Sequence, residues 1–479
     1  MFIILIISAP LITALLSLLI RSRFLVFEIL TILSAAIELA SAILIVPRVI
    51  SNGSYSIGSY FSIDALGAIL MLIISVIGLA ASLYSIGYIR REVAKQIIGF
   101  HRVKQYYIFL NFFILAMFSA VFTTSPIIMW IGIEATTLST AFLISFYNKP
   151  SATEAAWKYL IVNSVGLLLG FLGIMLFQTA AIGTPGISNW HFILANASSL
   201  NPFIAKIAFI FILIGYGTKV GLAPMHTWLP DAHSKAPVPI SSLLSGVLLN
   251  VAFLAILRFK AVTDAAVGQA FSQNLLIFFG IISISLAAFI IFAQKNYKRL
   301  LAYSSIEHMG IISLGFGFGG IGVFAGLLHM IYHSLAKSIL FLASGSIFLK
   351  YSSTKIINAK GVLSVLPISG IIFLIGFLAI TGVPPFGTFL TEFYILSAGM
   401  IQHPVITIVA LLALIVAFVG FLKNTHSMIF GEAPETISKG EANKWVVVPP
   451  LCLVAILLVL SFYLPQFVKL LINSAALIY

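Results

Sequence analysis

Lysine 219 lies in a hydrophobic stretch and is followed five residues later by Pro224, in the run GTKVGLAPMHTWLPDA. A charged side chain in the hydrocarbon of a bilayer is costly, and a proline there leaves a backbone carbonyl without its helical partner. Both features persist only where a function uses them. A lysine that gains and loses a proton at this depth indicates charge transfer, most simply of protons, through a membrane.

A second group of chemically capable residues follows a helical spacing. His329, His333 and Lys337 recur at i, i+4 and i+8, which places them within about 80° on one helical face. Histidine titrates near neutral pH, so this face could pass a proton stepwise; the alternative is a set of hydrogen-bonded core residues. We expect His308 to extend the row and His226 to link the broken-helix lysine to the inner surface. No metal site is expected, because no third and fourth ligand follow at a suitable spacing.

Several acids complete the candidate pathway. Glu134 and Glu392 fall deep in hydrophobic segments or beside a helix break, and we expect both to act in it. Glu307 lies near the inner edge of its segment, where a surface ion pair competes with a relay role. Lys158 is one turn after Glu154, so an i,i+4 ion pair is the alternative to a pathway role.

Composition defines the setting of these residues. Of 479 residues, 61% are hydrophobic and 8% are charged, which excludes an ordinary water-soluble globule. We predict an all-α polytopic membrane protein. A spanning helix needs about 20 apolar residues, and this length yields about fourteen transmembrane segments. These are 2–20, 24–46, 63–89, 106–123, 126–146, 155–179, 203–228, 237–257, 273–293, 300–317, 321–349, 362–400 in broken form, 404–422 and 445–464.

Lysine and arginine set the expected orientation. If the N-terminus lies outside, most of the 26 basic residues fall on the inner side, with Lys298 in an inner loop and Lys260 in an outer one, whereas the outer loop from Ala180 to Asn201 has none. We therefore expect a multi-pass protein of a prokaryotic plasma membrane with both termini on the outer side. The net charge of +13 then follows from topology, and no nucleic-acid partner is needed to explain it.

Cofactor motifs are missing from the sequence. Its single cysteine, Cys452, allows neither a disulfide nor a CxxC site nor an iron–sulfur cluster ligated by this chain alone. The phosphate-binding pattern GxxxxGK[ST] is not found either. We expect no cofactor and no metal, so any redox energy must come from a partner.

A weak internal repeat relates the two broken segments. Residues 221–229 read GLAPMHTWL and residues 382–390 read GVPPFGTFL, with Gly, Pro, Thr and Leu at matching places. The two copies enter the membrane from opposite sides in the predicted topology, as in the inverted repeats of secondary transporters. We therefore divide the chain into helices 1–3 (1–105), a first repeat (106–260), a second inverted repeat (261–425), and an inner loop with the last helix (426–479).

Several runs carry a resemblance to a known family. They are YSIGYIRREVA, IEATTLSTAFLISFY, EAAWKYLIVNSVG, GTKVGLAPMHTWLPDAHSKAPVPISSLLSGVLLN, KRLLAYSSIEHMG, LLHMIYHSLAKSILFLASGS and GVPPFGTFLTEF. The chain resembles the antiporter-like subunits of respiratory complex I, Mrp antiporters and group 4 membrane-bound hydrogenases, and most closely the hydrogenase-4 component F type. The resemblance spans nearly the whole chain and implies fourteen helices with two inverted five-helix repeats.

The resemblance also assigns roles by position. Glu134 resembles the family's fifth-helix glutamate, and Lys219 resembles the lysine of the broken seventh helix that pairs with it. Lys337 and the two preceding histidines resemble the eleventh-helix relay, and Glu392 resembles the terminal acid of the broken twelfth helix. One position departs from the pattern, because Asn250 stands where many relatives carry a lysine. An amide does not take up a proton near neutral pH, so the connection between the halves would need water or another histidine.

The function implied is a proton-translocating, or Na⁺-linked, antiporter-like subunit that carries no redox centre. Its complex would be redox-driven, either a group 4 NiFe-hydrogenase or a related complex I-like enzyme with a quinone-reductase arm. Expected partners are the other membrane subunits of that complex and its peripheral arm. Two alternatives remain open: an Mrp-type Na⁺/H⁺ antiporter subunit, and a structural membrane scaffold for a soluble oxidoreductase.

Overall fold

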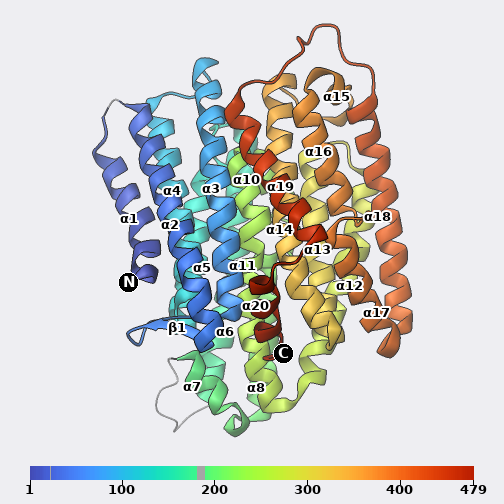
Figure 1. Cartoon of the computed structure of the whole chain (residues 1–479). Coiled ribbons are helices and arrows are strands. Elements are labelled where there is room, and N and C mark those ends of the chain that lie inside the picture. The colour runs from blue at the N-terminus through green and yellow to red at the C-terminus, as the bar shows by residue number, and fades with distance from the viewer. Residues whose placement is uncertain (22, 181–188) are drawn as a thin grey trace.

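A computed structural model describes residues 1–21, 23–180 and 189–479. Long helices stand side by side and form a single α-helical bundle (Figure 1). Part of the outer loop expected between Ala180 and Asn201, residues 181–188, lies outside the described residues. The prediction of an all-α polytopic membrane protein is confirmed.

Among the described residues, twelve helical segments are long and apolar enough to cross a membrane. They are α1 (Phe2–Leu19), α2 (Phe24–Asn52), α3 (Ala65–Ala94), α4 (Phe100–Phe122), α5 (Pro126–Ile144), α6 (Pro150–Ala180), α8 (Pro202–Val220), α10 to α11 (Val238–Leu243, Leu249–Val267, joined by the π-helical turn Leu244–Leu248), α12 (Gln269–Ala293), α14 (Ile321–Tyr351), α18 (Pro404–Phe430), and α19 (Val448–Phe462) with the preceding 3₁₀ turn Lys444–Val446.

The two remaining expected segments, 300–317 and 362–400, are also helical. They correspond to α13 (Tyr297–Phe318), which is rich in polar side chains, and to the divided pair α16 (Pro367–Ile380) and α17 (Gly387–Gln402). Shorter helices are α7 (Trp190–Ala195), α9 (Leu229–Lys235), α15 (Val362–Val365) and α20 (Gln466–Ala476), with 3₁₀ turns at Ala197–Ser199 and Ile356–Asn358. The C-terminal α20 was not expected, because its 11 residues are too few to span a bilayer.

The first helix break begins at Gly221, three residues before Pro224. Helix α8 ends there because Gly221 adopts a φ of +84°, which only glycine takes readily. The indole Nε1 of Trp228 donates at 2.8 Å to the carbonyl of Thr218, which also accepts from the backbone N–H of Gly221 at 3.1 Å. The backbone N–H of Ala223 donates to Ser283 Oγ on α12 at 2.9 Å. Ser283 thus satisfies a backbone N–H that would otherwise be left unpaired in hydrocarbon, and Trp228 adds a second donor at the end of α8.

A second break separates α16 from α17. Gly382 has a φ of +64°, and the backbone N–H of Gly387, where α17 begins, donates to Ser461 Oγ at 3.1 Å. The hydroxyl of Thr388 donates back to the carbonyl of Ala379 across the break. Both breaks fall in the fourth spanning element of a series of five, the first starting with α4 and the second with α12.

The connecting segments differ between the two ends of the bundle. The hairpin of β1 (Ser54–Ile57) and β2 (Phe61–Asp64), which pairs Ser54 with Asp64, lies at the same end as α7, and α15 lies at the opposite end (Figure 1). Loops expected outside and loops expected inside therefore separate in space. Helices α11, α13 and α14 are buried along most of their length and form the core of the bundle.

Candidate functional site

Lys219 lies in the last turn of α8, immediately before the break, and is fully buried. Its Nζ donates to Thr137 Oγ1 at 2.8 Å and to Tyr159 Oη at 2.7 Å, and lies 4.7 Å from the centroid of the Tyr159 ring. The Tyr159 hydroxyl is in turn 2.6 Å from Thr140 Oγ1. Hydroxyl groups and an aromatic face therefore replace the water that would surround an ammonium in solution.

Glu134 lies one turn before Thr137 on α5, the helix that solvates the lysine. One carboxylate oxygen of Glu134 accepts a hydrogen bond from Ser164 Oγ at 2.7 Å, and the other is buried without a protein partner among the described residues. No ion pair within the described chain joins Glu134 to Lys219. Glu134 and Thr137 are neighbours on one face of α5, so Thr137, which binds Lys219, lies close to both charged groups.

Lys158 pairs with Asp231 on α9 at 2.7 Å and not with Glu154. Arg299 on α13 binds the other oxygen of the same carboxylate. Burial raises the pKa of Asp231, but the hydrogen bonds from Lys158 and Arg299 outweigh it and hold the pKa below its usual value. The carboxylate therefore fastens three helices together at the end of the bundle expected to face inward.

Histidines connect the first break to the relay helix. His226 lies within the break, is mostly buried, and turns its ring toward Tyr303 at a centroid distance of 6.3 Å. On α9, His233 is fully buried and stacks on Phe341 of α14 at 5.1 Å. Neither ring nitrogen of His233 has a protein partner among the described residues. His233 was not among the predicted site residues, because no helical spacing relates it to the other candidates.

Two lysines that charge counting assigns to loops are in fact buried. Lys298, near the start of α13, donates to the carbonyl of Ala236 at 2.8 Å and is 4% exposed. Lys260, on α11, is fully buried and pairs with Asp264 one turn later. The expectation that both lie in solvent-facing loops is wrong, because neighbouring helices cover the ends of these segments.

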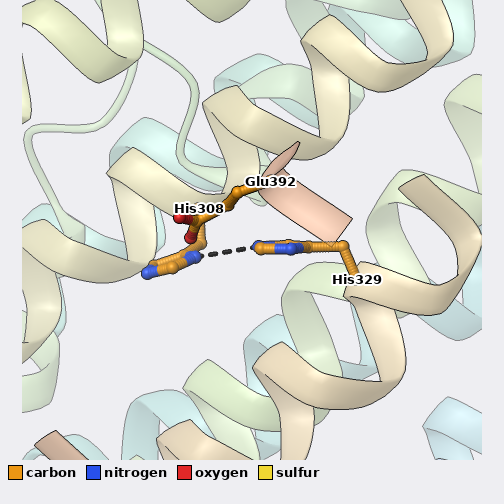
Figure 2. A group of neighbouring side chains, drawn as sticks. All are labelled: His308, His329 and Glu392. Carbon is orange, nitrogen blue, oxygen red and sulfur yellow. Dashed lines mark hydrogen bonds between the residues drawn. The ribbon is translucent and has the colours of Figure 1, made fainter. Parts of the chain in front are cut away.

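The helix α14 carries the predicted histidine row into the core. His308 Nδ1, on α13, lies 2.9 Å from His329 Nε2, and their rings stack at 5.1 Å (Figure 2). His329 Nδ1 lies 2.7 Å from Thr391 Oγ1 on α17. The ring of His333 is 5.5 Å from that of His308, and neither of its nitrogens has a protein partner in the described chain. His308 thus extends the row through space.

Acidic groups flank this row. A carboxylate oxygen of Glu392, on α17, lies within 4.8 Å of the facing nitrogens of His308 and His329 (Figure 2). Glu307 is only 5% exposed and forms no ion pair within the described chain, so it is not part of a surface pair. Lys337 lies on α14 two turns after His329. It is fully buried, and its Nζ donates to the carbonyl of Leu301 at 2.8 Å.

Asn250 joins α11 to the relay helix. Its Nδ2 donates to Ser334 Oγ at 2.7 Å and to the carbonyl of Met330 at 3.2 Å. These residues each follow a relay histidine in sequence. The Oδ1 of Asn250 is buried without a protein partner among the described residues, and no hydrogen bond of the described chain connects Asn250 to Lys219.

Comparison with known proteins identifies the class to which this fold and site belong. Residues 123–420 match the family model described as NADH:quinone oxidoreductase/Mrp antiporter, TM, and residues 49–96 match the N-terminal model of complex I chain 5. The chain belongs to this family and is one of its antiporter-like membrane subunits. The resemblance inferred from the sequence motifs is therefore confirmed.

Two individual relatives show which members of the family this sequence is similar to. The chain is 38% identical over 427 residues to a hydrogenase-4 component F homolog of Methylacidiphilum infernorum, covering 88% of this chain and 86% of that protein. It also matches the chloroplast NAD(P)H-quinone oxidoreductase subunit 5 of Piper cenocladum at 30% identity over 75% of this chain, but spans only 48% of that longer protein.

Solved structures share the fold at lower identity. A chain of the archaeal membrane-bound sulfane sulfur reductase superposes with a TM-score of 0.87 at 24% identity, covering 99% of this chain and 97% of that one. A chain of the Mrp complex from Dietzia sp. DQ12-45-1b gives a TM-score of 0.87 at 18% identity, covering 100% and 97%. The architecture is therefore common to complexes with different named activities.

Proposed function

We propose that this chain is the proton-translocating subunit of a redox-driven membrane complex, of the group 4 NiFe-hydrogenase or a related complex I-like type. The observation that carries the proposal is a row of proton-binding side chains across the bundle, in which the lysines and histidines are buried and the two acids are half-buried. Lys219 and Glu134 stand at one side, His308, His329 and Lys337 lie in the core, and Glu392 follows at the second break. Buried ionisable groups in a membrane protein are costly and mark ion pathways.

In the proposed mechanism, charge at Glu134 controls the proton on Lys219. While Glu134 is negative, its field favours the ammonium form that Thr137 and Tyr159 solvate. When a neighbouring subunit draws the carboxylate away or neutralises it, the buried ammonium loses that support and releases its proton toward the relay. The proton then passes Lys337 and the histidine row, and leaves by Glu392, which lies beside His308 and His329.

Water must complete the connection near Asn250. Its amide holds Ser334 and neither gives nor takes a proton itself, but its Oδ1 is free to bind water. The unpartnered nitrogens of His233 and His333 offer further positions for water. A hydrated polar seam between the two helix breaks is therefore part of the proposal.

The proposed orientation in the membrane follows from the distribution of basic residues and from the internal repeat. The chain resides in a prokaryotic plasma membrane with both termini outside, and the two series of five helices, 106–260 and 261–425, are inverted copies. Supporting this, the basic loops and the hairpin lie at opposite ends of the bundle, and each series breaks at its fourth member. Its partners are the other membrane subunits and a peripheral hydrogenase or quinone-reductase arm. The chain carries no redox centre in this scheme.

An Mrp-type Na⁺/H⁺ antiporter subunit is the second candidate, favoured by the equally close superposition on the Mrp chain. Purification of the native complex separates the two. A nickel-containing or quinone-reducing arm that co-purifies supports the first proposal, and a complex without one that exchanges Na⁺ for H⁺ supports the second. Full coupling after loss of Lys219 would leave only a scaffold role.

A further inference from the structure

We propose that His308, His329 and Glu392 form a binding site for a divalent transition-metal ion of the zinc type, and that an ion bound there blocks the relay. Their facing ligand atoms lie within 4.8 Å of one another and come from three different helices, α13, α14 and α17 (Figure 2). Two imidazole nitrogens and one carboxylate oxygen, with a fourth position open, are a set that Zn²⁺ accepts. Spacing along the chain gave no hint of this set, because helix packing assembles it.

The two histidine nitrogens need little movement to bind one ion, and the Glu392 carboxylate, within 4.8 Å, closes onto it by side-chain rotation. His308 Nδ1 and His329 Nε2 are 2.9 Å apart, which is a hydrogen-bond separation. Two nitrogens on a tetrahedral zinc, each at about 2.0–2.1 Å, lie about 3.3 Å from each other. A small rotation of either imidazole therefore opens the space, and the metal takes the place of the hydrogen that the two rings share.

The hydroxyl of Thr391 orients the imidazole ring of His329, one of the proposed metal ligands. The Thr391 hydroxyl donates to the carbonyl of Thr388 at 2.9 Å, so it accepts from His329 Nδ1 at 2.7 Å. His329 then carries its hydrogen on Nδ1 and directs the lone pair of Nε2 toward His308; this tautomer is assigned from the partners. Such an outer hydrogen bond orients a ligand histidine and strengthens its bond to a metal.

Surrounding groups supply a fourth ligand and balance the charge. His333, whose ring is 5.5 Å from that of His308, has both nitrogens free of protein partners in the described chain, and water is the other choice. The Glu392 carboxylate offsets part of the metal's charge. Lys337 opposes it, but lies about 12 Å along the helix from His329 and points to the carbonyl of Leu301.

The blocking effect rests on the proposed function, whereas binding does not. A metal between His308 and His329 takes the lone pairs of both facing nitrogens, so the hydrogen on His308 Nδ1 moves to His308 Nε2 and both rings are fixed. Proton transfer along the row would stop while the protein remains folded. Metal binding is therefore measured directly, apart from transport.

The test is a Co²⁺ titration of the purified full chain, followed by the visible bands of the bound ion and by competition with Zn²⁺. The background variant replaces three exposed histidines, His101, His191 and His426, with alanine to remove surface binding. We expect one Co²⁺ per chain in this background, and its loss in Glu392→Gln and in His329→Gln. Thr391→Val, which leaves every ligand in place, should weaken binding by about 10- to 100-fold.

Helical circular dichroism and gel filtration must show that each variant is folded. An unchanged Co²⁺ spectrum in folded Glu392→Gln and His329→Gln would overturn the proposed site, as would the absence of stoichiometric binding in the background variant. If Co²⁺ and Zn²⁺ bind as expected but Zn²⁺ leaves proton transport in vesicles unchanged, the blocking effect is wrong.

Discussion

The side-chain amide of Asn250 donates a hydrogen bond to the hydroxyl of Ser334 at 2.7 Å. This contact joins α11, which follows the first helix break, to the relay helix α14. Ser334 directly follows His333, so any change at Asn250 acts on the relay at close range. Asn250 therefore stands where the structure couples the two series of helices.

Two substitutions of Asn250 should show whether proton transport needs a polar side chain at this position. We expect Asn250→Leu to slow proton transport, because it removes the polar oxygen that would bind water and leaves Ser334 without its donor. Asn250→Lys should be tolerated, since an ammonium also donates to Ser334. Transport by reconstituted vesicles is the measurement. Full activity in Asn250→Leu would mean that the two series do not exchange protons at this point.

The indole of Trp228 should stabilise the first helix break. Trp228→Phe removes one of the two donors to the carbonyl of Thr218, which keeps the N–H of Gly221, and the loss of such a hydrogen bond costs about 0.5–1.5 kcal/mol. We expect a lower unfolding temperature in detergent and slower transport. Trp157→Phe is the matched control, because Trp157 is 61% exposed. Equal stability of both variants would contradict the structural role given to Trp228.

The Asp231 carboxylate should give the inner end a pH-dependent stability. Its folded pKa lies below its unfolded value of 3.8, so the contribution is fully present above that value and is lost as pH falls through the folded pKa. We expect Asp231→Asn to destabilise the protein near neutral pH by about 1 kcal/mol, because the pairs with Lys158 and Arg299 are partly exposed. The difference from wild type should vanish in strong acid. A difference that grows on acidification would contradict these pairings.

The proposed sidedness is testable with single cysteines. The native Cys452 is exposed and is first replaced by alanine. In intact cells, an impermeant thiol reagent should label Ser198→Cys, beside α7, and should not label His101→Cys at the start of α4 until the membrane is opened. The opposite labelling pattern would reverse the orientation.

Features encoded by spacing were accessible from sequence alone. Lys219 stands out because a charge beside a proline conflicts with a hydrophobic segment, and the i, i+4 pattern placed His329 and His333 on one face. The order of the spanning helices and the positions of both breaks follow from hydropathy and from glycine and proline. These signals are local, so a single sequence carries them.

Contacts that arise from the packing of distant helices could not be predicted from the sequence. Lys298 and Lys260 are buried because other helices cover them, and charge counting treats both as loop residues. Lys158 pairs with Asp231, 73 positions away, in preference to the neighbouring Glu154. The contact of Thr391 with a relay histidine likewise depends on how α17 meets α14. No periodicity in the chain specifies such contacts.

The most direct test of the account compares two lysines of one helix. Lys219 is buried at the break of α8, whereas Lys206 is exposed at the other end of the same helix. In vesicles that contain the complete complex, Lys219→Ala should nearly abolish proton transport while assembly and electron transfer persist, and Lys206→Ala should transport as wild type does. Lys219→Arg should also fail, because a guanidinium does not release its proton. Wild-type rates of proton transport in Lys219→Ala would contradict the account.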